Sequence, residues 1–409
     1  MANNSVGDQQ IFFNDRIKQR FMKKNGFILG ALLLAITSAN AQVVDSTASP
    51  LTVGGYVKFM NTNLIESLKG DWLSENMFHN RLNFQWAPSS HFSAGLGLRN
   101  RLIYGDFVKQ IPGYTAMADN DPGFVDMSKN IASGSSYFLN ITADRLWLDY
   151  HQQGLDLRVG RQRINWGQTF VWNANDVFNS YSFFDFDYEE RPGSDAVRLS
   201  LYPSSFSTVD MAVKMEHDST VTVGFLYKFN HWGYDIQLLG GELKGSDVFA
   251  GAGWSGSIGG AGFDGEVTYI RPISNFGGAQ GHLLASVGGS YSFANSLSLQ
   301  GEVFYNGFAT DSSNIGFFNY YYRPLDIKNL SFSKYSAFAQ VSYPVTPLLS
   351  VSLAAMAYSQ PNAFYFGPSA TYSLSDNLEV DLSSQVFHLS SGGIYQNIGL
   401  VFFRLRQSF

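Results

Sequence analysis

The feature that most constrains the fold of this 409-residue chain is an alternation of apolar and polar residues along almost its whole length. In one stretch, Leu146, Leu148 and Tyr150 fall on the same face of an extended segment, because strand side chains alternate with period two. The side chains between them, among them Arg145 and Asp149, fall on the other face. No stretch after residue 41 approaches 18 consecutive apolar residues, which argues against helical membrane spans.

Segments with this alternation recur about 18 times, each near the length of roughly 9 to 11 residues with which a tilted strand crosses a bilayer. They lie near residues 51–62, 78–88, 91–103, 140–151, 154–163, 194–203, 207–216, 219–229, 232–243, 246–258, 261–270, 282–293, 296–308, 334–343, 348–359, 362–373, 377–388 and 394–406. The chain also holds 40 Gly, 35 Phe and 22 Tyr but only 15% charged residues. Such a composition indicates sheet that faces something other than water.

The connections between these segments sort by length along the chain. Every second connection is a tight turn, and all the long ones fall in the other set: 63–77, 104–139, 164–193, 271–281 and 309–333. Bacterial outer-membrane barrels join their strands by short periplasmic turns and longer extracellular loops. The sequence therefore predicts one all-β domain over 42–409, a transmembrane antiparallel up-and-down β-barrel of about 16 to 18 strands in the bacterial outer membrane.

The last segment supports the same reading. Val401, Phe403 and Leu405 share one face with Phe409, the last residue of the chain. A closing strand that ends in Phe resembles the signal that outer-membrane barrels present to the barrel assembly machinery. We therefore expect Phe409 to be the assembly signal and outer-membrane lipid to surround the apolar face.

An export signal precedes the barrel. Residues 22–41 combine a basic start, a short apolar run over 27–36 and a small-residue cleavage site ending at Ala41, which together are typical of a secretory signal peptide. Ten apolar residues are too few to span a bilayer of about 30 Å as a helix. Residues 1–21 fit no targeting pattern, so we interpret them as a non-native or mis-annotated extension, with translation starting at Met22.

Composition also excludes several classes of function. The chain has no Cys, which excludes disulfides, thiolate zinc sites and cysteine nucleophiles. Removal of 1–41 takes away five basic and two acidic residues, so the formal charge moves from -6 to -9. A charge of this sign argues against nucleic acid as a partner.

If the apolar residues face lipid, the residues between them line the barrel interior. The basic residues expected to line the pore are Lys58, Arg81, Arg99, Arg101, Arg145, Arg158, Arg198, Arg404 and Arg406. Glu302, Glu379 and Asp381 make the opposite wall mildly acidic. Such a wall would favour anions, as charged rings do in channels. The alternative is that these Arg pair with loop carboxylates and select nothing.

The connection 164–193 is the expected constriction. Its acids Asp185, Asp187, Glu189 and Glu190 alternate with aromatic side chains, and a loop of this kind is poorly suited to lie free in water. We predict that it folds into the barrel. The expected partners of its acids are the basic residues that flank it in sequence: Arg158, Arg161, Arg163 and Arg198.

Three short stretches of the sequence resemble a family. They are Arg158-Val-Gly-Arg-Gln-Arg-Ile-Asn-Trp-Gly167, Asn175-Asp-Val-Phe-Asn179 and Arg191-Pro-Gly. They are similar to a Gly-Arg-Gln strand and Trp-Gly turn in porin-like barrels of Gram-negative bacteria, including alginate-export-type and related porins. The three stretches fall within residues 158–193. The resemblance implies a barrel with an inward loop and, as in many porins, a homotrimer as a candidate assembly, but no particular substrate.

The expected function is passive diffusion of small polar, including anionic, solutes through a porin. One alternative is a non-conducting adhesin or assembly barrel that binds through the long connections 104–139 and 309–333. An outer-membrane hydrolase is less favoured, because no Gly-x-Ser-x-Gly elbow occurs and the seven His are scattered. Asp119, Asp121 and Asp126 make an incomplete calcium loop, so no metal or cofactor is expected.

Overall fold

A computed structural model describes residues 49–66, 70, 72–309, 321, 325–359, 362–391 and 394–409. The expected signal peptide, the extension 1–21 and most of the tip of the connection 309–333 lie outside these residues. Pro50–Ser408 forms one structural unit, which contains all the strands.

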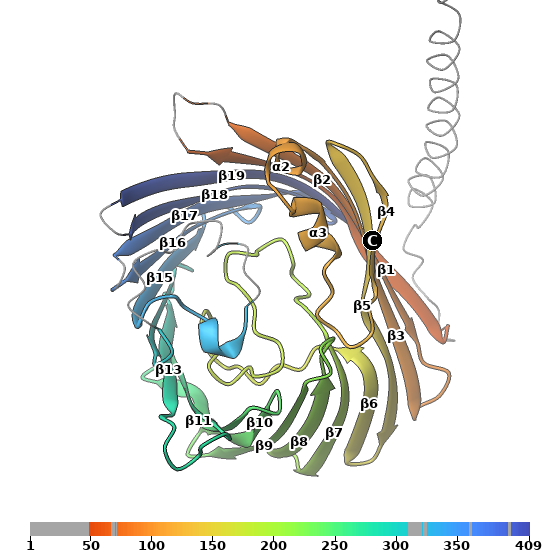
Figure 1. Ribbon diagram of the computed structural model, residues 1–409, viewed down its shortest axis with the longest axis vertical. Coiled ribbons are helices and arrows are strands. Elements are labelled where there is room, and N and C mark those ends of the chain that lie inside the picture. The colour runs from red at the N-terminus through yellow and green to blue at the C-terminus, as the bar shows by residue number, and fades with distance from the viewer. Residues whose placement is uncertain are drawn as a thin grey trace, which may run out of the picture. The chain divides into compact units, whose positions relative to one another are not determined.

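The unit is made almost entirely of antiparallel strands (Figure 1). They are β1 (Leu51–Ile65), β2 (Leu73–Trp86), β3 (Phe92–Gly105), β4 (Ser128–Ser133), β5 (Tyr137–Gln152), β6 (Leu155–Gln162), β7 (Ser194–Ser204), β8 (Ser207–Met215), β9 (Val221–His231), β10 (Tyr234–Leu243), β11 (Asp247–Ile258), β12 (Ala261–Pro272), β13 (His282–Ser292), β14 (Ser298–Asn306), β15 (Tyr335–Pro344), β16 (Leu349–Tyr358), β17 (Ala363–Ser375), β18 (Leu378–Ser391) and β19 (Ile394–Ser408).

Eighteen of these strands close into a barrel. Each pairs with its neighbour in sequence, apart from β4, and β1 pairs with both β2 and β19. Closure sets Lys58 opposite Arg406 and Tyr56 opposite Ser408. A closed sheet leaves no strand edge unpaired, which is the condition for strands to span a bilayer. The predicted barrel and its strand number are confirmed.

β4 and two short helices were not predicted. They lie in the connection 104–139, where α2 (Asp106–Gln110) and α3 (Tyr114–Asp119) follow β3. β4 pairs with β5 at residues 138–142, beyond the part of β5 that pairs with β6. It therefore adds to the wall only at the long-loop end. A six-residue strand in a polar loop carries too little alternation to be recognised.

The lengths of the connections follow the predicted alternation. The turns at one end of the barrel are short, such as 153–154, 232–233 and 259–260, whereas the long connections 106–136 and 163–193 lie at the other end. No helix among the described residues is both long and apolar enough to cross a membrane.

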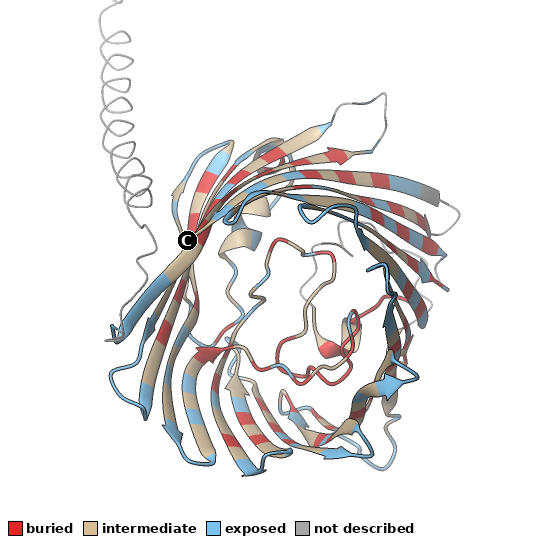
Figure 2. Ribbon diagram, turned by 180° about the vertical axis from the view of Figure 1, so that it is seen from behind, coloured by how far each residue is buried: buried red, intermediate tan, exposed pale blue. Residues whose placement is uncertain are grey.

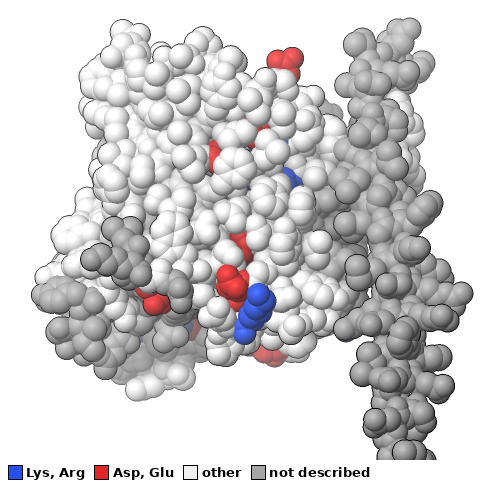
Figure 3. Space-filling model, turned by 90° about the horizontal axis from the view of Figure 1, so that it is seen from above, with Lys and Arg blue, Asp and Glu red and all other residues white. Residues whose placement is uncertain are grey.

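The two faces of the wall differ in character. Along β1 the side chains alternate between buried and partly exposed, with Tyr56, Lys58 and Met60 facing inward. Figure 2 shows this striping around the barrel. The outward positions are mostly large and apolar, such as Leu148 and Phe225, and few charged groups are visible on the face of the barrel drawn in Figure 3. An apolar outer band and a polar interior are the arrangement of a transmembrane barrel.

Candidate functional site: the lumen and its inward loop

Residues 164–193, here called the inward loop, lie inside the ring of strands (Figure 1). The loop has no helix or strand, yet many of its side chains are buried, including Ile164, Trp166 and Phe178. Trp166 meets Phe178 edge to face, and Trp172 stacks on Phe304 of the wall with ring centroids 5.6 Å apart. The aromatic side chains of the loop are thus packed against other apolar groups in the lumen and are not exposed to water.

The first half of the inward loop is hydrogen-bonded to the wall between β8 and β14. Trp166 donates its indole N–H to Asp210 at 2.9 Å, and Gln237 donates to the Trp166 carbonyl at 2.8 Å. Gly224 faces Trp166, and a side chain there would approach the indole ring to 2.7 Å. The small residue in the wall is therefore what allows the indole to lie against the sheet.

The second half of the inward loop places its acids against β1, β2 and β19. Asp187 lies 2.7 Å from Lys58 Nζ, Glu190 lies 3.2 Å from Arg81 Nε, and Glu189 lies 2.9 Å from Arg406 Nη1. Arg145 adds a hydrogen bond of 2.5 Å to the Glu190 carbonyl. Residues 187–190 are thus held by cations that lie far from them in sequence.

The predicted partners of these acids were wrong. Arg158 pairs with Asp149 at 2.8 Å, Arg161 with Asp121 and Asp195 at 2.6 and 2.7 Å, and Arg198 with Asp210 at 2.7 Å. Arg163 lies 3.7 Å from Asp176, an acid of the loop outside the predicted group. The reason is register. Arg158 stands directly opposite Asp149, and Arg161 opposite Asp195, so carboxylates on the neighbouring strands take these cations first.

Asp144 is a charged lumen residue that was not predicted from the sequence. The pairing of β3 with β5 shifts between Gly97 and Leu98, which is a β-bulge opposite residues 143–145. A bulge sets two residues of one strand against one of its partner. Asp144 and Arg145 consequently both reach lumen groups, and the buried Asp144 lies 2.7 Å from buried Arg81. Strict alternation had placed Asp144 on the opposite face from Arg145.

The predicted pore-lining cations divide into two groups. All nine lie on the lumen side, and seven of them have a carboxylate within ion-pair distance: Lys58, Arg81, Arg145, Arg158, Arg198, Arg404 and Arg406. Arg99 and Arg101 have none among the described residues. Arg99 lies over the Tyr188 ring at 3.6 Å, and Arg101 donates to Asn140 and to the Ala118 carbonyl.

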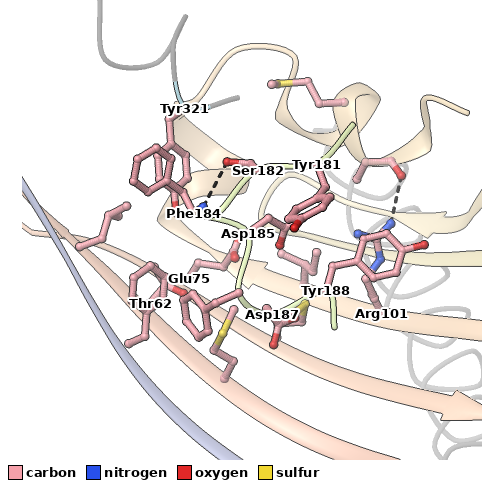
Figure 4. Close-up of a pocket in the computed structure, with 18 of the residues that line it drawn as sticks. Thr62, Glu75, Arg101, Tyr181, Ser182, Phe184, Asp185, Asp187, Tyr188 and Tyr321 are labelled. Carbon is pink, nitrogen blue, oxygen red and sulfur yellow. Dashed lines mark hydrogen bonds between the residues drawn. The ribbon is translucent and has the colours of Figure 1, made fainter. Parts of the chain in front are cut away.

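These two arginines line a cavity in the lumen of about 450 Å³. Glu75 and Thr62 contribute from the wall, and Asp185 and Tyr188 contribute from the inward loop (Figure 4). The cavity lies toward the long-loop end, because it contacts the later residues of β1 and β3 and the helices α2 and α3. It is therefore a chamber between the inward loop and the long connections.

Burial and neighbouring charges together shift the pKa values of the loop residues Arg191, Asp185 and Asp187. Arg191, which also lines the cavity, stacks on Tyr181 at 3.1 Å and has no carboxylate at ion-pair distance among the described residues. Burial lowers the pKa of Arg191 to about 10, so it stays charged at neutral pH. Burial raises the pKa of Asp185, and the charge of Arg99 offsets this effect only in part. Burial opposes ionisation of Asp187 too, but His79 and Lys58 outweigh it and hold its pKa well below the usual range.

Asp121, in the incomplete calcium loop of the sequence, has structural contacts within the chain. Asp121 accepts hydrogen bonds from the backbone of Gly123 and Met127 and pairs with Arg161. No cluster of potential metal ligands occurs in the described part of the chain. Asp121 thus fixes the connection after α3 to the wall.

The backbone conformation at Gly160, in the Gly-Arg-Gln stretch, explains why this position is a glycine. Gly160 has a φ of 113°, and a side chain at that position would collide with the Leu146 carbonyl of the neighbouring strand. Only glycine adopts such a conformation readily. The kink lets Arg161 and Gln162 both turn into buried positions at the start of the inward loop.

Comparison with known proteins shows the fold. No protein-family model and no curated protein sequence matches the chain. Among solved structures, OccAB1 and OccAB4 of Acinetobacter baumannii superpose with TM-scores of 0.54 and 0.56 at 10% and 7% identity. These matches cover 87% and 89% of this chain and 96% and 99% of theirs. OccK11 (OpdR) of Pseudomonas aeruginosa gives 0.53 at 11% identity, covering 88% and 96%. At these identities the likeness establishes the barrel fold alone.

Proposed function

We propose that the chain is a bacterial outer-membrane porin that passes small polar solutes, with a preference for anions, by passive diffusion. The observation that carries the proposal is the lumen itself. A closed wall with an apolar outer band surrounds a polar interior, and within it a 450 Å³ chamber holds arginines without carboxylate partners among the described residues. The apolar outer face is stable in lipid, whereas the charged interior is stable in contact with water. A barrel in a membrane with an aqueous path through it satisfies both conditions.

The preference for anions rests on Arg99, Arg101 and Arg191. The other seven predicted pore-lining cations have carboxylate partners, so their fields are largely cancelled at a distance. The three chamber arginines face Glu75 and Asp185, and Glu75 is hydrogen-bonded to Tyr114. A low-dielectric wall strengthens the field that remains. A small anion entering the chamber would therefore meet donors whose charge is not already neutralised.

The inward loop is the proposed constriction. Its two halves are attached to opposite walls, the first to β8 through β14 and the second to β1, β2 and β19, so the chain crosses the lumen between them. Phe409 as assembly signal, the homotrimer, the signal peptide and a relation to alginate-export-type barrels remain predictions.

Planar-bilayer recording of residues 42–409 tests the function. We expect ohmic single-channel steps and, across a KCl gradient, a reversal potential on the chloride side. Heat-modifiable migration on a gel checks that the barrel is folded. A folded barrel that conducts no ions would overturn the proposal in favour of an adhesin or a sealed barrel.

Deletion of residues 183–188 tests the constriction. Loss of this segment removes the aromatic and acidic part of the inward loop, so conductance should rise. Deletion of residues 274–279 from the exposed β12–β13 connection serves as the control and should leave conductance unchanged. Equal conductance of the two folded variants would refute the constriction while leaving the channel intact.

A further inference from the structure

Two carboxylates of the barrel wall bind the backbone of the inward loop. Glu302 of β14 accepts hydrogen bonds from the N–H groups of Phe170, Val171 and Trp172 at 2.9, 2.7 and 2.8 Å. Ser286 of β13 donates its hydroxyl to the same carboxylate at 2.6 Å. Four donors of the chain itself thus converge on one carboxylate.

Glu266 of β12 repeats the arrangement beside it. It accepts from the N–H groups of Gln168, Thr169 and Asn175, the last two at 2.9 and 2.7 Å. Thr268, two residues further along β12, donates to the Asn175 side chain at 2.6 Å. The two carboxylates together satisfy six consecutive or near-consecutive N–H groups of a segment that has no secondary structure of its own.

Neither glutamate has a cation as partner in the part of the chain that the structure describes. Glu266 and Glu302 are 1% and 3% exposed, and no Lys, Arg or His lies within ion-pair distance of either among the described residues. A buried carboxylate needs compensation, because its transfer out of water is costly. Here the loop backbone supplies that compensation. Conversely, the buried N–H groups of 168–175 need acceptors, and the carboxylates are the acceptors.

We propose that Glu266 and Glu302 are positioning residues that fold segment 168–175 onto the wall and so fix the aperture of the pore. The segment is then a permanent part of the channel wall, in contrast to a flap that leaves the lumen. The second half of the inward loop, which is held by ion pairs, follows this fixed segment in the chain. The effect on the aperture rests on the proposed channel function, whereas the folding of the segment does not.

Hydrogen exchange tests the proposal without reference to transport. In the folded wild-type barrel, the amides of residues 168–172 and 175 should be protected although they lie in no strand. Glu302→Gln sets an amide NH2 group against backbone donors, so exchange of 170–172 should accelerate on the order of tenfold or more, with 168, 169 and 175 affected less. Glu266→Gln should give the reverse pattern.

Asp264 provides a matched control. It lies two residues before Glu266 on the same face of β12, and its side chain contacts no loop amide in the described part of the chain. Asp264→Asn removes the same charge from the same wall and should leave protection of 168–175 unchanged. Loss of protection in this variant, or unchanged protection in both glutamine variants, would overturn the proposal.

Conductance separates the anchoring of the segment from its control of the aperture. If the aperture is set by the anchored segment, Glu302→Gln and Glu266→Gln should raise open-channel noise and mean conductance, and Asp264→Asn should not. Altered protection with unchanged conductance would reject the control of the aperture but keep the anchoring. A wild-type barrel that shows the protection yet never conducts would reject the proposed function alone.

Discussion

Lys58 and Asp187 form a buried ion pair across 129 residues of sequence, with Lys58 Nζ 2.7 Å from Asp187 Oδ1 and 2.6 Å from its carbonyl oxygen. Lys58 comes from β1 and is 1% exposed. Asp187 is also 3.9 Å from Arg404 of β19. The pair attaches the second half of the inward loop to the wall.

Removal of one partner should therefore be costly. Lys58→Met leaves Asp187 buried beside a weaker set of contacts, and we expect it to lower the free energy of unfolding by about 3 to 5 kcal/mol. The double variant Lys58→Met with Asp187→Asn should regain most of this loss, because both charges are gone. Guanidinium unfolding in detergent measures both. Equal midpoints for wild type and Lys58→Met would show that the pair contributes nothing to stability.

Glu189→Gln should change selectivity more than stability. Glu189 lies 2.9 and 3.4 Å from Arg406 and Arg404, but its side chain is 37% exposed, so water and salt screen the pairs. We expect a loss of about 1 kcal/mol or less. The released guanidinium charge should shift the reversal potential toward chloride. Asp376→Asn, an exposed acid in the β17–β18 turn, is the control and should shift it less.

Arg99→Gln and Arg101→Gln should each weaken anion preference. Both side chains line the chamber without a carboxylate partner among the described residues, so their charge acts on the solute rather than on the wall. The chloride-to-potassium permeability ratio should fall several-fold. Lys129→Gln removes an exposed cation of β4 and should have little effect. A ratio that responds equally to all three substitutions would place selectivity outside the chamber.

Asp176 should make stability depend on pH. Burial raises its pKa from the usual 3.8 to about 6, and Arg163 at 3.7 Å compensates only in part. Because the folded-state pKa lies above the unfolded one, this contribution is fully present below about pH 4 and is lost as the pH rises through about 6. The size is on the order of 3 kcal/mol.

Asp176→Asn keeps the site neutral at every pH and should flatten this dependence. Relative to its own value at pH 4, the unfolding midpoint of the wild type should fall as the pH rises to 7, and the midpoint of Asp176→Asn should fall less. Parallel curves would show that Asp176 does not titrate in this range.

Much of the barrel could be predicted from sequence because its signals are local. Period-two alternation and the parity of turn lengths are visible without knowledge of which strands pair, and the observed strands differ from the predicted ones mainly at their ends. β4 and the bulge at Asp144 were missed because both break the alternation on which the prediction depended.

The partners of the inward loop could not be predicted because they depend on register and closure. Arg158 and Arg161 flank the loop, yet Asp149 and Asp195 stand directly opposite them on adjoining strands. The acids of the loop instead reach Lys58 and Arg406, which become neighbours only when the first and last strands pair. Glu302 was predicted as an acid of the wall, but the binding of loop N–H groups by Glu266 and Glu302 could not be predicted, since the sequence does not show which backbone N–H groups lack a partner.

The contacts of Asp187 with Lys58 and Arg404 have a consequence for the order of assembly. The first half of the inward loop binds β8 through β14, which are consecutive and can pair as the chain emerges. The Asp187 site contains one residue from each end of the chain and does not exist until the β1–β19 seam has formed. The contacts of Asp187 with both residues are therefore complete only when the seam is closed, and reopening the seam has to separate Asp187 from Lys58 or from Arg404, a contact that adds to the pairing of the two strands.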